Sequence, residues 1–126
     1  MKAILVKAGK SDVSEAVTVV DIKPELDNYY KLLECSTIDM KAIRLGDRHY
    51  DIICDDEGLF VNPDELYVTY TNLTQSDSVA GNILLVGPPD EEGCETSLTD
   101  DDIVNIHRHI GLSVQHGQRT ILILNK

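Results

Sequence analysis

The sequence is poor in basic residues and contains no long apolar run. It has 11 Lys and Arg against 22 Asp and Glu, which gives a formal net charge of −11. Nucleic acids and anionic membranes are bound mainly through cationic side chains, so this charge argues against direct binding to either. The apolar run at residues 3–6 is too short for a signal peptide, and no segment approaches the ~20 apolar residues of a membrane span. We therefore expect a cytoplasmic protein.

Cysteine is also scarce, and its three copies are scattered. Cys35, Cys54 and Cys94 are odd in number and lack C-x-x-C spacing, which argues against a disulfide framework and fits a reducing compartment. Cys54 lies in the apolar run 52–54 and is expected to be buried. Cys35 follows a predicted helix and is expected to be structural. Carboxylates around Cys94 should raise its thiol pKa, so we expect it to be a poor nucleophile.

What is present has the composition of an ordinary globular domain. The 126 residues are 42% hydrophobic and 26% charged, values that argue against a disordered chain. A chain of this length buries enough surface to fold without a metal ion or a disulfide. We therefore predict one domain over residues 1–126 and expect no cofactor.

Hydrophobic periodicity predicts an α+β domain with a mixed or antiparallel sheet and two main helices, at about residues 24–34 and 99–110. Thr99 is the expected N-cap of the second helix, and Gly111 its expected stop. Gly46 is expected to begin a tight hairpin turn. The final strand is expected to be central in the sheet or to form a dimer. The predicted strands are residues 2–7, 16–22, 38–45, 49–54, 81–87 and 120–124, whereas 66–70 is ambiguous.

Charge is unevenly distributed along the chain. No Lys or Arg occurs between His49 and His107, a stretch with 14 acidic residues. One interpretation is a solvated surface that maintains solubility. The other is an acidic face that engages a basic surface of a partner, since electrostatic complementarity speeds the encounter and sets specificity. The candidate partner-binding residues are Asp55, Asp56, Glu57, Asp90, Glu91 and Glu92.

Two segments carry metal-ligand residue types without the spacing of a metal site. The acidic turn that begins at Asp55 places Leu66 where a calcium loop needs a bidentate glutamate. His107 and His109 point about 200° apart on a helix, so together with His116 they do not easily hold one zinc ion. We therefore expect no metal site.

No familiar catalytic motif is present, because GxSxG, HExxH, P-loop and GxGxxG patterns are all absent. Asp39 and Asp51 could supply a general acid and base, yet no nucleophile accompanies them. The tyrosines could stack on a nucleoside, although tyrosines at helix and strand positions more often pack at the edge of a core. They are Tyr29, Tyr30, Tyr50, Tyr67 and Tyr70. We assign no catalytic residues and lean against an enzyme.

Several short segments nevertheless form a pattern by their order and spacing. They are residues 1–6, Cys35-x-x-Ile38-Asp39, residues 50–58, Asn62-Pro63, Gly81-Asn82, and residues 96–99 with the acidic helix start that follows. The pattern resembles a family of small proteins encoded by phages, plasmids and conjugative elements and described only as a domain of unknown function. The resemblance covers about residues 1–110. It implies an accessory protein of a mobile element, and it brings no catalytic residues.

Three functions remain open. The leading hypothesis is a non-enzymatic protein that binds and inhibits a host protein, such as a component of anti-phage defence, through its acidic surface. The alternative is a sponge that sequesters a nucleotide-type immune signal at a subunit interface of a homo-oligomer. The third is a metal-dependent, phosphodiesterase-like enzyme that uses Asp51 or Asp55. The candidate ligand residues of the sponge are Tyr50, Arg44, Arg48, Arg108 and Arg119.

Overall fold

The computed structural model describes residues 1–7, 17–55, 67–71, 76–80, 82–115 and 118–124. None of the helices in these ranges is long and apolar enough to cross a membrane. The elements are β1 (Lys2–Val6), β2 (Val17–Asp21), α2 (Leu26–Leu33), β3 (Ile38–Leu45), β4 (Arg48–Asp55), β5 (Tyr67–Thr71), β6 (Ser76–Ala80), β7 (Ile83–Val86), α4 (Asp100–Arg108), β8 (Ile110–Gln115) and β9 (Gln118–Leu124).

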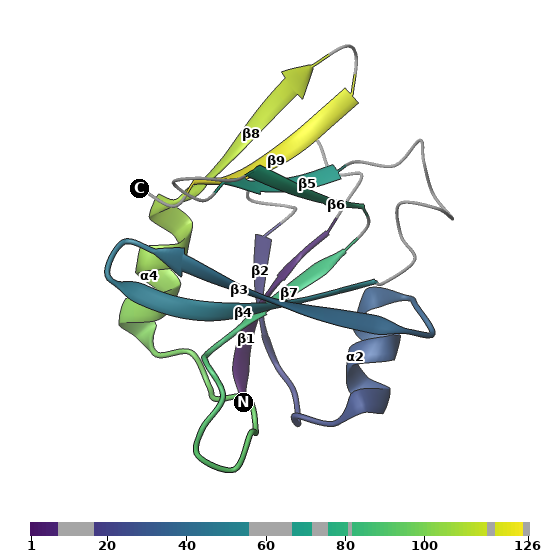
Figure 1. Ribbon diagram of the computed structural model, residues 1–126, viewed down its shortest axis with the longest axis vertical. Coiled ribbons are helices and arrows are strands. Elements are labelled where there is room, and N and C mark those ends of the chain that lie inside the picture. The colour runs from purple at the N-terminus through teal and green to yellow at the C-terminus, as the bar shows by residue number, and fades with distance from the viewer. Residues whose placement is uncertain (8–16, 56–66, 72–75, 81, 116–117, 125–126) are drawn as a thin grey trace.

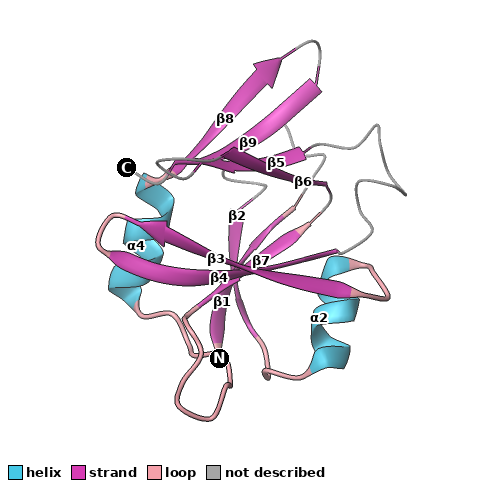
Figure 2. Cartoon of the chain, in the orientation of Figure 1, coloured by secondary structure: helices cyan, strands magenta, loops and turns pink. Residues whose placement is uncertain are grey.

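The described strands form two sheets (Figures 1 and 2). The first has the order β2-β1-β7-β4-β3, and every neighbouring pair is antiparallel. The second has the order β6-β5-β9-β8, in which β5 and β9 run parallel and the other pairs are antiparallel. The fold is therefore α+β, as the periodicity predicts.

Strand alternation divides the five-stranded sheet into two apolar faces, each covered by one helix. Ile4 and Val6 of β1 point to the side of α4, here called the α4 face, whereas Ala3 and Leu5 point to the α2 face. Figure 1 shows the two helices on opposite sides of the strands. The all-buried strand β7 lies at the centre of the sheet, which explains its continuous apolar run.

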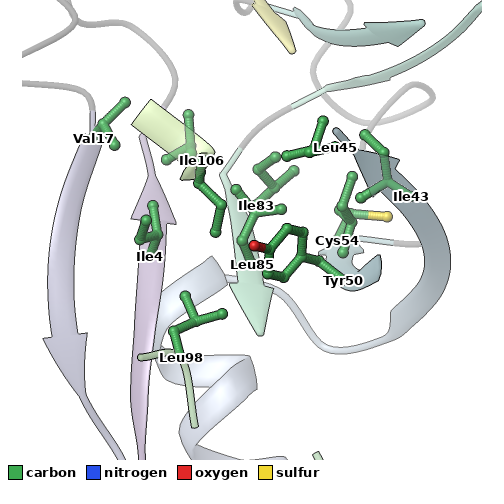
Figure 3. Close-up of a cluster of buried hydrophobic side chains, with 12 residues drawn as sticks. Ile4, Val17, Ile43, Leu45, Tyr50, Cys54, Ile83, Leu85, Leu98 and Ile106 are labelled. Atoms are coloured by element: carbon green, nitrogen blue, oxygen red, sulfur yellow. The ribbon is translucent and has the colours of Figure 1, made fainter. Parts of the chain in front are cut away.

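The larger cluster of buried side chains lies on the α4 face (Figure 3). Ile106 of α4 packs there against side chains from the sheet, and Leu98, which lies just before the helix, packs in the same cluster. Tyr50 of β4 belongs to this cluster and is only 1% exposed. Cys54 belongs to the same cluster, so the predicted burial of this cysteine is confirmed.

A single carboxylate fastens α4 to the β3–β4 hairpin. Asp102 Oδ2 accepts hydrogen bonds from the backbone N–H and the hydroxyl of Thr99, both at 2.9 Å. Thr99 Oγ1 in turn accepts the Asp102 backbone N–H, which completes a capping box. Asp102 Oδ1 accepts from Arg48 Nη1 at 2.7 Å and from the Tyr50 hydroxyl at 2.9 Å. The predicted N-cap at Thr99 is thus confirmed.

Asn105 adds a second tie between the same two elements. Its Nδ2 donates to the Leu45 carbonyl oxygen at 3.0 Å and to the Tyr50 hydroxyl at 3.1 Å. The hairpin turn between β3 and β4 contains Gly46 at φ +64°, as its sequence predicts. Two residues of α4, Asp102 and Asn105, therefore hold the Tyr50 hydroxyl at the edge of the core.

The end of α4 differs from the prediction. The helix ends at Arg108, and the backbone N–H of His109 donates to the Ile106 carbonyl oxygen at 3.0 Å. Gly111 is not a helix stop, because it lies inside β8 and pairs with Leu122. This segment pairs as a strand with β9, which begins only three residues after β8 ends. The alternation of apolar residues from Ile110 to Val114 was the available signal.

The second sheet was only partly predicted. β9 is central, as expected, because it pairs with β5 on one side and β8 on the other. β6 and β8 were missed. β6 has only two apolar residues, at its end. β8 alternates Ile110, Leu112 and Val114 with smaller or polar residues, a strand signal that the expected helix stop at Gly111 overlooked. The acidic turn expected to begin at Asp55 lies, apart from Asp55 itself, outside the described residues.

The Asp102 network predicts acid-sensitive stability. Burial raises the pKa of Asp102, but the hydrogen bonds from Thr99, Arg48 and Tyr50 outweigh it and lower that pKa to about 2. The unfolded value is about 3.9, so the charged carboxylate stabilises the fold above about pH 4, and this contribution is lost as the pH falls towards 2. We expect Asp102→Asn to lower the free energy of unfolding by about 2 kcal/mol at pH 7 in urea denaturation.

The exposed neighbour provides the control for this prediction. Asp101→Asn removes the same charge from the first turn of α4 but no contact to the hairpin, so it should change stability by less than about 0.5 kcal/mol. The difference between Asp102→Asn and the parent protein should narrow between about pH 4 and 2. A constant difference across that range would contradict the assigned role of the carboxylate.

Candidate functional site

The loop between β7 and α4, residues 87–99 and here called the acidic loop, holds the best-defined group of candidate partner-binding residues. It includes Asp90, Glu91, Glu92 and Glu95 and contains no Lys or Arg. Asp90, Glu91 and Glu92 are all exposed. Figure 1 shows the loop beside the N-terminus, at the end of the molecule opposite the second sheet. It therefore presents a concentrated negative charge to solvent.

The backbone of the acidic loop is folded around the side chain of Asp90. Its Oδ1 accepts the N–H of Glu92 at 2.9 Å and that of Cys94 at 3.0 Å. The Asp90 backbone N–H bonds to the Cys94 carbonyl oxygen, and Gly93 closes the turn at φ +81°. Asp90 thus sets the loop conformation, whereas Glu91 and Glu92 project from it. The sequence contained this signal as an aspartate three residues before a glycine.

The base of the acidic loop is fixed to the sheet. Gly87 N–H donates to the Thr96 carbonyl oxygen at 2.9 Å, and a Cβ at Gly87 would collide with Thr96. Lys2 N–H donates to Ser97 Oγ, and Leu98 N–H to the Lys2 carbonyl oxygen, both at 2.9 Å. The loop is therefore held at both ends, so its carboxylates are positioned before any partner arrives.

Glu95 connects the acidic loop to α2. Its Oε2 accepts a hydrogen bond from the Tyr29 hydroxyl at 3.1 Å. Burial, followed by the charge of Glu95 and this hydrogen bond, raises the pKa of Tyr29 far above its usual range. Burial also raises the pKa of Asp51 on β4, and the charge of Glu95 raises it further. Asp51, Glu95 and Tyr29 thus form a half-buried polar group between α2 and the sheet.

The acidic helix start has two kinds of aspartate. Asp100 and Asp101 are exposed, and Asp100 lies 3.5 Å from Lys2 Nζ. Asp102 is turned inward to Arg48, and its side chain is only 16% exposed. In the sequence these three aspartates form one acidic run at the helix start. The spacing of Thr99 and Asp102 was the available signal for the separate role of Asp102.

The other acidic candidates lie elsewhere. Asp55 ends β4 beyond Cys54, which pairs with Ile83 at the start of β7. The acidic loop leaves the opposite end of β7, after Val86. Asp55 and the acidic loop are therefore separated by the length of β7, and Asp56 and Glu57 lie outside the described residues. The two candidate groups do not meet within the described part of the chain.

The structure separates the candidate ligand residues of the sponge hypothesis. Tyr50 is buried, with its hydroxyl bonded to Asp102, and Arg48 is bonded to the same carboxylate. Arg44 pairs with His49, so strand alternation places it on the α2 face, opposite Arg48 and Tyr50. Its Nε donates to the Gly46 carbonyl oxygen at 2.9 Å. Arg108 is exposed at the end of α4, and the side chain of Arg119 is not described.

The histidines of α4 make bonds to their own helix. His107 Nδ1 lies 2.8 Å from the Ile103 carbonyl oxygen, and His109 Nδ1 lies 2.7 Å from that of Asn105. His116 lies outside the described residues. Within the described ranges, no three His, Cys, Asp or Glu side chains gather where they could hold a metal ion. Cys35 is partly buried, and this burial raises its thiol pKa, as does the charge of Asp55.

Loss of the Asp90 carboxylate should loosen the acidic loop without unfolding the protein. We expect Asp90→Ala to speed amide hydrogen exchange at Glu92 and Cys94 about tenfold, because each amide loses its acceptor. Glu91→Ala removes the same charge but no backbone contact, and it should leave both rates unchanged. Residue-resolved exchange by NMR measures the effect. Equal rates in the two variants would contradict the role of Asp90.

The half-buried position of Asp51 predicts an elevated carboxyl pKa. An NMR titration should place this pKa above the usual value of about 3.9. Glu95→Gln should lower it only in part, because burial is the larger cause. A raised folded pKa means that the charged form costs stability above that pKa, so Asp51→Asn should stabilise the protein at pH 7. A normal Asp51 pKa in the parent protein would contradict this geometry.

Comparison with known proteins yields one match. Residues 1–111 match the model of the family described as Domain of unknown function (DUF3846). Neither the curated proteins nor the solved structures contain a significant match. The matched region ends inside β8, so β9, the central strand of the second sheet, lies beyond it. Because the match spans most of the sequence, the chain belongs to the DUF3846 family.

Proposed function

We propose that this protein is a non-enzymatic binding protein that recognises a basic surface of a partner protein through its acidic loop. The observation that carries the proposal is the fixed conformation of the loop, in which Asp90 organises the backbone and Glu91 and Glu92 face solvent. Neither glutamate forms an ion pair with a basic side chain among the described residues. Their charges are therefore available to a partner.

The physical advantage of such a loop lies in preorganisation. Like charges held close together repel one another, and hydrogen bonds to the sheet and to α2 maintain the loop against this repulsion. A partner with a basic surface relieves the repulsion, and the loop loses little conformational entropy on binding. The net charge of −11 attracts the same partner over a longer range.

The resemblance to proteins encoded by mobile elements suggests the class of partner. We propose a host protein, such as a nucleic-acid-binding component of anti-phage defence, whose basic groove the acidic loop would occupy. This would inhibit the host protein by competition with its nucleic acid. The sponge hypothesis has less support, because Arg44 lies on the opposite face of the sheet from Arg48 and Tyr50.

Charge reversal in the acidic loop tests the proposal. We expect the tagged protein to retain a basic host protein from a bacterial lysate at low salt and to release it as salt is raised. The double variant Glu91→Lys/Glu92→Lys should weaken this binding at least about tenfold. Affinity is measured with the purified partner by calorimetry.

The matched control makes the same charge change on α2. Glu25 and Glu34 flank that helix and are both exposed, so Glu25→Lys/Glu34→Lys alters the net charge equally while the acidic loop stays intact. This variant should keep most of the affinity. An equal loss of affinity in the two variants would mean that binding depends on net charge alone and not on the acidic loop. Unchanged affinity of the loop variant for the partner would also contradict the proposal.

A further inference from the structure

The two edge strands of the five-stranded sheet, β2 and β3, differ in how well they are protected against pairing with a strand of another molecule. The β3 edge carries the charged residues Asp39, Lys41 and Arg44, which oppose pairing with another strand. Asp39 Oδ1 also accepts the backbone N–H of Met40 at 2.9 Å. The β2 edge has the sequence Val-Thr-Val-Val-Asp, without Lys, Arg or Pro. Its valines and threonine favour β-structure, and its single charged residue, Asp21, lies at the end of the strand.

Hydrogen bonding within the sheet determines which groups of β2 face outward. Ile22 N–H donates to the Met1 carbonyl oxygen at 2.9 Å, and bonded residues alternate along an antiparallel pair. Thr18 and Val20 therefore bond to β1, whereas the N–H and C=O groups of Val17, Val19 and Asp21 point away from the sheet. Within the described ranges, β2 has no strand partner other than β1. Its outer edge thus presents three donors and three acceptors.

We propose that this edge binds a second copy of the chain, with β2 pairing antiparallel to itself about a two-fold axis at Val19. In this register Val19 faces Val19 of the partner subunit, and Val17 faces Asp21 of the partner subunit. Every outward-pointing residue then meets another outward-pointing residue, which permits six backbone hydrogen bonds across the interface. The two five-stranded sheets become one continuous sheet.

Side chains and charges at the edge are compatible with this occupant. Val19 is 48% exposed, and the two-fold axis buries it against its own copy. Asp21 Oδ1 lies 2.9 Å from the N-terminal ammonium of Met1, which offsets its negative charge. The two Asp21 residues fall at opposite ends of the paired strands, about 13 Å apart, which exceeds the screening length of about 8 Å at physiological salt.

Net charge gives this interface a distinctive salt dependence. Two copies at −11 each repel one another over a long range, and salt screens that repulsion. Self-association should therefore strengthen as salt is raised, whereas binding of a basic partner to the acidic loop should weaken. The two proposals thus predict opposite responses and can fail independently.

Sedimentation equilibrium over a range of protein concentrations tests the proposal. The parent protein should approach twice its 14.0 kDa mass. Val19→Lys places two like charges on the two-fold axis and should raise the dissociation constant at least about tenfold. Val104 on α4 provides the matched control, because it is 50% exposed, and Val104→Lys should leave the dimer intact. A monomeric parent, or equal dimerisation of both variants, would overturn the proposal.

A crosslink gives a second, independent readout if Val19→Lys fails to fold. Directly paired strand residues lie close enough for a disulfide, so Val19→Cys should form a covalent dimer under mild oxidation. Cys94 is exposed, and the experiment therefore uses the Cys94→Ser background. Val104→Cys in the same background should form no covalent dimer. A dimer in solution that Val19→Cys does not crosslink would assign the interface to another surface and overturn the proposal.

Discussion

The Asp102 carboxylate is the contact on which the arrangement of this fold depends. Its two oxygens accept four hydrogen bonds, two from Thr99 at the start of α4 and two from Arg48 and Tyr50 of the hairpin. A mostly buried carboxylate is costly unless such partners surround it. Satisfying it therefore fixes the helix start, the orientation of the hairpin and the buried tyrosine hydroxyl at the same time. The α4 face of the core closes around this arrangement.

The acidic loop is a consequence of the same construction. Leu98 packs in the core on the α4 face, and Thr99 begins the helix. The end of the acidic loop is therefore held beside the start of β1, where the Leu98 N–H donates to the Lys2 carbonyl oxygen. Glu95 meets Tyr29 of α2, which connects the loop to the opposite face of the sheet. The acidic loop is thus attached to both faces of the sheet, through Leu98 on the α4 face and through Glu95 on the α2 face. The proposed recognition by charge depends on the exposed carboxylates of this loop.

The edges of the sheet show a further division of roles. The β3 edge is charged, and Asp39 covers one of its backbone donors. The β2 edge leaves its donors and acceptors facing outward beside an exposed valine. The acidic loop and this edge use different physics, since one depends on charge and the other on backbone hydrogen bonding. The interactions proposed for the loop and for this edge therefore do not compete for the same kind of contact.

The sequence by itself determined the α+β class, both helices, the Thr99 cap, the Gly46 turn and the strands of the first sheet, because each depends on neighbouring residues and on hydrophobic periodicity. It also placed the acidic residues of the loop in one segment. Only the tertiary structure decided that Asp102 faces the core, since its partners Arg48 and Tyr50 lie 54 and 52 residues away in sequence. The parallel pairing of β5 with β9 was likewise decided by tertiary structure, because it joins segments distant in sequence, such as Val68 with Ile121. Such pairing depends on contacts that no local pattern encodes.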